Sequence, residues 1–136
     1  MGRRDSMRNT LIFLVFFSLL IFCGVTHESV QCEEAGNICV FFFYGSGCLK
    51  CENTKLYISE LEQKYSQLSV YRFEVYGNRS NLNLLNSLFD EYGIPEDQMQ
   101  IPALFINDKC LVGEEQIRTE LEGDTQSLLS TGCRSP

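Results

Sequence analysis

An unbroken apolar run, followed by a glycine turn and then a helical pattern, constrains the fold of this chain more than any other feature. The run Ile38–Phe43 contains no polar residue, which is typical of a central strand covered on both faces. Gly45-Ser46-Gly47 ends the run, and apolar or small side chains then recur at steps of three and four over 48–68. The members of this stripe are Cys51, Thr54, Ile58, Leu61, Tyr65 and Leu68. A doubly buried strand joined to an amphipathic helix predicts an α/β fold.

The rest of the chain continues this alternation of strands and helices. Period-2 patterns predict strands, and leucine or aromatic stripes at helical spacing predict helices. The remaining predicted elements are a strand over 69–76, a helix over 81–92, two strands over 103–106 and 110–112, and a helix over 114–130. The predicted order is therefore β-α-β-α-β-β-α, with a central mixed sheet and helices on both of its faces.

The N-terminal 30 residues are typical of a targeting segment. Three arginines precede an apolar run over 11–22, and small and polar residues follow it. A buried helix of the domain itself is disfavoured because the run has no polar face. We therefore expect residues 1–30 to be a signal peptide or an uncleaved signal anchor, and residues 33–136 to form one domain. That domain is expected to be secreted or otherwise extracytoplasmic, where disulfides persist.

The charge balance argues against a nucleic-acid partner. Residues 28–136 carry 17 acidic and 8 basic side chains, a net charge of −9. A surface of this sign repels phosphate backbones, and no run of lysine or arginine offsets it. We expect no nucleic-acid binding, and contact with a membrane only through the N-terminal segment.

A C-x-x-C motif, Cys48-Leu49-Lys50-Cys51, stands where the predicted strand gives way to the predicted helix. A cysteine at a helix N-terminus favours the thiolate, whereas Cys51 begins the buried stripe. This pairing suits thiol–disulfide exchange, in which Cys48 attacks a substrate disulfide and Cys51 resolves the mixed disulfide. Lys50 adds positive charge that stabilises the thiolate. A static structural disulfide is the alternative.

Metal binding fits the motif poorly because it requires two further ligands. His27, which lies within the expected targeting segment, is the only histidine, and there is no second C-x-x-C. We expect no metal and no organic cofactor, since the two sulfurs carry the electrons themselves.

Ile101-Pro102 directly precedes the predicted strand over 103–106, and with the C-x-x-C and the element order it makes residues 37–130 resemble the thioredoxin superfamily. The resemblance implies a thioredoxin-like fold and a cis Pro102 that faces the dithiol. It also implies that Ile101 lends its backbone to bound substrate. The segment Phe43–Cys48 is similar to small exported thioredoxin-like proteins associated with membrane thiol transporters, which makes such a transporter a candidate partner.

The predicted function is that of a thiol–disulfide oxidoreductase acting on protein or small thiol substrates. One alternative is a non-catalytic binding module with a structural Cys48–Cys51 disulfide. Another is a glutaredoxin-like enzyme that uses glutathione, which we rank lower because no basic cluster for its carboxylates is visible. Of the other cysteines, Cys39 is expected to be a buried apolar thiol. Cys110 and Cys133 form a candidate structural disulfide, because an antiparallel return of the last helix would bring them close.

Overall fold

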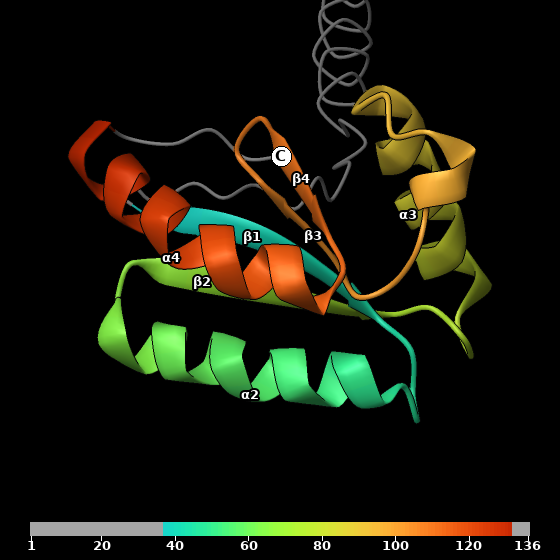
Figure 1. Cartoon of the computed structure of the whole chain (residues 1–136), viewed down its shortest axis with the longest axis horizontal. Coiled ribbons are helices and arrows are strands. Elements are labelled where there is room, and N and C mark those ends of the chain that lie inside the picture. Colours follow the sequence, from blue (N-terminus) through green and yellow to red (C-terminus); the bar gives the residue numbers. More distant parts are fainter. Residues whose placement is uncertain (1–36, 132–136) are drawn as a thin grey trace, which may run out of the picture. The chain divides into compact units, whose positions relative to one another are not determined.

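The computed structural model describes residues 37–131, which contain four strands, three α-helices and one 3-10 turn (Figure 1). In chain order these are β1 Ile38–Tyr44, α2 Leu49–Lys64, β2 Leu68–Glu74, α3 Arg79–Glu91, η1 Glu96–Gln98, β3 Ala103–Ile106, β4 Lys109–Val112 and α4 Glu114–Thr131. The predicted order β-α-β-α-β-β-α is confirmed. The predicted targeting segment, and the parts of the predicted domain before residue 37 and after residue 131, lie outside the described residues.

The four strands form one mixed sheet in the order β2-β1-β3-β4. β1 runs parallel to β2, with Val40 opposite Val70, and antiparallel to β3, with Phe42 opposite Leu104. β3 and β4 form an antiparallel hairpin in which Phe105 lies opposite Cys110. β1 is thus an interior strand, as its continuous apolar sequence predicts.

Side chains of β1 alternate between two cores, one on each face of the sheet. Val40 and Phe42 pack with α2 and α4, whereas Phe43 packs with α3. Figure 1 shows α2 and α4 as neighbours, with α3 set apart from them. The helices therefore lie on both faces, as predicted, and α2 carries the C-x-x-C motif on the two-helix face.

The ends of the helices follow local capping chemistry. The side-chain oxygen of Asn78 accepts hydrogen bonds from the backbone N–H groups of Ser80 (3.0 Å) and Asn81 (3.2 Å). This cap starts α3 at Arg79, two residues before the predicted start. After α3, Gly93 adopts a positive φ of 65°, as expected of the glycine that ends a helix. The 3-10 turn Glu96–Gln98 forms within a segment that has no strong helical pattern.

Candidate active site

Cys48 is the N-cap residue of α2, which begins at Leu49. The predicted helix begins at residue 48, so its predicted start differs from the observed one by one residue. Its backbone is extended, with φ −80° and ψ 109°, and its carbonyl accepts the first helical hydrogen bond, from Glu52 N–H at 3.0 Å. The preceding turn is closed by Cys48 N–H donating to the Gly45 carbonyl at 3.2 Å. Gly47 completes the turn at a φ of 79°, where a side chain would be strained.

The Cys48 sulfur also accepts a hydrogen bond from the backbone N–H of Cys51, at 3.2 Å. Cysteine thereby takes the capping role that serine or aspartate usually plays, and it satisfies one of the free N–H groups of the first turn. The same N–H groups and the helix dipole stabilise negative charge on this sulfur when the disulfide is reduced.

Cys48 and Cys51 form a disulfide, with their Cα atoms 5.2 Å apart. The two sulfurs differ in access, because Cys51 is fully buried whereas Cys48 is only partly covered. Leu49, between them, is 76% exposed. An incoming thiol or disulfide can therefore approach the pair only from the side of Cys48.

The buried side chain of Thr54 stabilises the first turn of α2. This residue is fully buried, and its hydroxyl donates to the Lys50 carbonyl at 2.7 Å. Its place in the helical stripe is therefore compatible with burial, since its one polar atom is satisfied. Thr54 packs inward while Lys50, one turn earlier, remains exposed to solvent.

Ile101 and Pro102 lie directly before β3, and the peptide bond between them is cis. Pro102 is buried, and its carbonyl accepts a hydrogen bond from Gly113 N–H at 2.8 Å. This bond ties the segment before β3 to the residue that precedes α4. Ile101 is partly exposed and faces the same pocket as Lys50.

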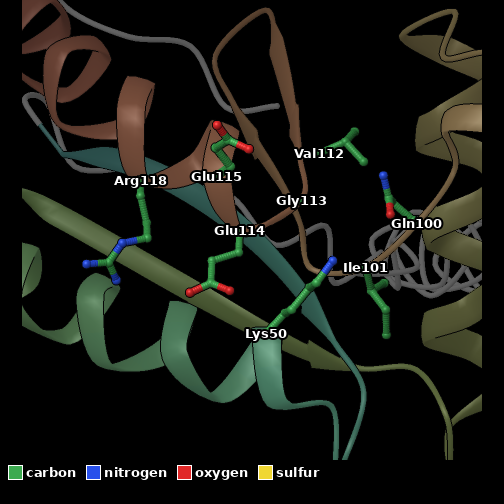
Figure 2. Close-up of a pocket in the computed structure, with 8 residues that line it drawn as sticks. All are labelled: Lys50, Gln100, Ile101, Val112, Gly113, Glu114, Glu115 and Arg118. Carbon is green, nitrogen blue, oxygen red and sulfur yellow. The ribbon is translucent and has the colours of Figure 1, made fainter.

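A pocket of about 520 Å³ lies beside the dithiol helix (Figure 2). Lys50 reaches it from α2, Gln100 and Ile101 from the segment before β3, and Glu114 and Arg118 from α4. The complete lining consists of Lys50, Gln100, Ile101, Val112, Gly113, Glu114, Glu115 and Arg118. Two cations and two carboxylates thus surround one cavity, so it suits a polar ligand better than an apolar one.

Most of these charges are not neutralised by neighbours. Lys50, Glu114 and Glu115 make no ion pair with any residue between 37 and 131, and the Arg118 guanidinium lies over the Tyr57 ring at 5.0 Å. Sequence reasoning predicted Lys50 and Ile101 but missed Gln100, Glu114, Glu115 and Arg118. The only signal for the four is their adjacency to Ile101 and to the start of the last helix.

The structure gives no support for the expected Cys110–Cys133 disulfide, because Cys110 is a free thiol in it. Cys110 lies opposite Phe105 and packs in the core beneath α3, whereas α4 packs on the other face of the sheet, where Leu111 points. The last helix therefore returns on the face from which Cys110 is turned away. Cys133 lies outside the described residues. Burial raises the pKa of the Cys110 thiol to about 12.

The expectation that Cys39 is a free thiol is wrong. Cys39 is buried as predicted, at 1% exposure, but it is disulfide-bonded rather than a free thiol. Its partner cysteine lies outside the described residues. Burial in a strand does not distinguish a thiol from a half-cystine, because both pack as small apolar side chains.

The described part of the chain has neither a cluster of metal ligands nor a helix suited to a membrane. Between residues 37 and 131 there is no group of three or more histidine, cysteine, aspartate or glutamate side chains that could hold a metal ion. No helix in that range has the length and apolarity needed to cross a bilayer.

Comparison with known proteins establishes the fold. No family model and no curated protein matches the sequence. The holo form of glutaredoxin C1 from Populus tremula x tremuloides is similar in structure, with a TM-score of 0.51 and 18% identity over 74% of this chain and 86% of that one. A buckwheat glutaredoxin in complex with glutathione is also similar, with a TM-score of 0.49 and 16% identity over 69% of this chain and 78% of that one.

A third similar structure is an uncharacterized thioredoxin-like protein from Porphyromonas gingivalis, with a TM-score of 0.46 and 19% identity over 75% of this chain and 82% of that one. The order of elements and the likeness to the Populus structure define a thioredoxin-like fold. Residues 37–131 thus have a thioredoxin-like fold, with a Cys48–Cys51 disulfide at the N-terminus of the first described helix.

Proposed function

We propose that this protein is a thiol–disulfide oxidoreductase whose reactive pair is Cys48 and Cys51. One observation carries the proposal: the partly exposed Cys48 sulfur caps α2, while its disulfide partner Cys51 is fully buried. Exchange chemistry needs an accessible, thiolate-forming attacker and a shielded resolving thiol, and this arrangement supplies both.

In the reducing direction, the Cys48 thiolate attacks one sulfur of a substrate disulfide. A Cys48–substrate disulfide forms, and the other substrate sulfur leaves as a thiolate that takes a proton from water. The Cys51 thiol loses its proton and attacks the Cys48 sulfur, which releases the second substrate sulfur. The substrate gains two electrons and two protons, and the protein is left with the Cys48–Cys51 disulfide. The oxidising direction is the reverse sequence.

We propose that Ile101 and Pro102 form the substrate platform. Ile101 lines the pocket that Lys50 also lines, so a segment bound along Ile101 lies beside the first turn of the dithiol helix. Lys50 contributes positive charge on the same side, which favours the Cys48 thiolate and the thiolate that leaves the substrate. No metal or organic cofactor has a part in this scheme.

A glutaredoxin-like activity on glutathione mixed disulfides is a second candidate. Lys50, Arg118 and the Gln100 amide line the pocket, which neither cysteine of the pair lines, and such groups can hold the carboxylates of a small thiol. Glu114 and Glu115 line the same pocket and oppose an anionic ligand. We therefore rank protein disulfides first. Turnover of a glutathione mixed disulfide that exceeds turnover of a disulfide-bonded peptide would reverse this ranking.

We further propose that the domain acts outside the cytoplasm, released or anchored by its N-terminal segment, with protein thiols or a membrane thiol transporter as redox partner. The support for this is the basic start and apolar run of the sequence. Fractionation of cells that produce the full chain should place the dithiol domain on the outer side. A cytoplasmic protein with its N-terminus intact would contradict the proposal.

The direct test of the chemistry is to trap the mixed disulfide. The Cys51→Ser variant of the full chain, incubated with a disulfide-bonded peptide, should accumulate a covalent adduct through Cys48 because the resolving thiol is missing. The Cys48→Ser variant should form none at this motif. Equal adduct formation by the two variants, or none by either, would leave a structural disulfide as the better account.

A further inference from the structure

The segment that leads into Cys48 is held by a carboxylate from a different strand. Glu74, the last residue of β2, accepts hydrogen bonds from the backbone N–H groups of Ser46 (3.1 Å), Tyr76 (3.0 Å) and Gly77 (2.8 Å). Ser46 is 28 residues away in sequence and two residues before the reactive cysteine. One side chain thus joins the turn after β1 to the turn after β2.

Tyr76 makes a second contact between the same two turns. Its ring lies against Gly45 so closely that a Cβ built on this glycine would collide with three ring carbons. Tyr76 is 67% exposed, so the ring is not held there by burial in a core. The backbone continues the contact, because Val75 N–H donates to the Tyr44 carbonyl at 2.9 Å.

The contacts of Glu74 and Tyr76 matter because the backbone of segment 45–48 is intrinsically flexible. Two of its residues are glycines, and glycine has the greatest backbone freedom of any residue. The position of Cys48 as the cap of α2, with its sulfur 3.2 Å from Cys51 N, depends on the conformation of this segment. A restraint on Ser46 and Gly45 therefore restrains the atom that we propose to be the nucleophile.

The hydrogen bonds also keep Glu74 in its ionised carboxylate form, which is the form that accepts them. They lower the pKa of its carboxyl from the ordinary value, with the Gly77 N–H contributing most. The group is therefore an anion at neutral pH and accepts from all its donors at once.

We propose that Glu74 and Tyr76 are positioning residues, which hold the 45–48 turn so that the Cys48 sulfur stays at the N-terminus of α2. This inference deepens the proposed function and rests on Cys48 being its nucleophile. Neither residue exchanges electrons or protons with substrate. Their effect is on the share of Cys48 present as an oriented thiolate, and therefore on its rate of attack.

The test measures Cys48 alkylation at pH 7 in full-length Cys51→Ser protein, with the modified residue identified by peptide mass spectrometry. Glu74→Ala should slow alkylation about fivefold, the size of effect expected when a helix cap loses its geometry. Tyr76→Ala and Gly45→Ala should also slow alkylation of Cys48. The first variant removes the ring, and the second adds a Cβ that displaces the ring from Gly45. Tyr76→Phe keeps the ring and should leave the rate unchanged.

The matched control is Glu62→Ala, which removes a carboxylate that pairs with Arg72 on β2 and has no contact with the 45–48 turn. Its alkylation rate should equal that of the parent. Glu74→Gln keeps a hydrogen-bonding side chain of the same size and should lie between the parent and Glu74→Ala, which provides a second reading if the alanine variant unfolds.

An alkylation rate in Glu74→Ala and Glu74→Gln equal to or above that of the parent would overturn the inference. A faster rate would mean that Glu74 acts mainly by repelling the thiolate. Because alkylation needs no disulfide substrate, this outcome is distinct from failure of the proposed function, which would appear as absent turnover in the unaltered protein.

Discussion

Cys48 and Cys110 are both partly exposed, but Cys48 is disulfide-bonded at a helix end whereas Cys110 is a free thiol on a strand. Cys48 caps a helix, accepts a backbone N–H and is partly open to solvent. Cys110 lies on the edge strand β4, packs against the core under α3, and has a pKa raised to about 12 by burial. One environment stabilises a thiolate and the other opposes it.

The comparison teaches that the reactivity of a cysteine in this fold depends on which backbone groups it meets. Unpaired N–H groups at a helix end stabilise negative charge on sulfur, whereas apolar neighbours leave the neutral thiol as the stable form. The motif spacing locates the proposed reactive pair, and we propose that the helix end makes Cys48 suitable for attack. The predictions below separate these two contributions.

The largest effect should come from removing each sulfur in turn. Cys48→Ser should reduce disulfide turnover at least about 10⁴-fold, because a hydroxyl at this position is a poor nucleophile. Cys110→Ser should leave turnover within about twofold of the parent, because Cys110 has no part in the exchange. The measurement is reduction of a disulfide-bonded peptide by the full chain. A comparable loss in both variants would break the comparison.

The next effect concerns alkylation at pH 8. The Cys110 thiol, with a pKa of about 12, is ionised to roughly one part in 10⁴ at this pH. A thiol at a helix N-terminus, as we expect for Cys48 in the reduced protein, has a pKa at or below the free value of about 8.5, so at least roughly a quarter of it is thiolate. In Cys51→Ser protein, Cys48 should therefore react about a thousand times faster than Cys110. Raising the pH should accelerate Cys110 until near its own pKa, with Cys48 levelling off much earlier. Equal rates in the folded protein would contradict both assignments.

The smallest effect should come from lysines near the two sulfurs. Lys50→Gln should slow Cys48 alkylation only about twofold, because Lys50 is exposed and its charge is screened by water and salt. Lys109→Gln, next to Cys110, is the matched control. It should leave Cys110 equally unreactive, since burial rather than charge raises that pKa. A Lys50 effect that persists in high salt would show a closer contact than simple screening allows.

Sequence patterns predicted the fold because apolar side chains recur at a different spacing in its strands than in its helices. The apolar run of β1 and the helical stripe of α2 each allow one reading, and their order limits the topology. The predicted boundaries of an element differ from the observed ones where one side chain determines where the element begins. The start of α3 depends on the capping bond of Asn78, which periodicity does not register.

The candidate site was predictable where its residues are close in sequence. Cys48, Lys50 and Cys51 share one helical turn, so their spacing was informative. The pocket joins residues from α2, the segment before β3 and α4, and only the tertiary fold brings Gln100 and Arg118 to it. The face of Cys110 could not be predicted, because β4 has four residues and a shift of one residue reverses every side chain.

The most direct test of the central claim is the reduction potential of the Cys48–Cys51 pair, measured by equilibrating the full chain with a thiol–disulfide redox buffer of known potential. A sulfur stabilised as thiolate at a helix N-terminus favours the reduced form. The account therefore predicts a potential between about −270 and −120 mV, the range of dithiol oxidoreductases. A potential below about −300 mV is that of a structural disulfide and would contradict the account.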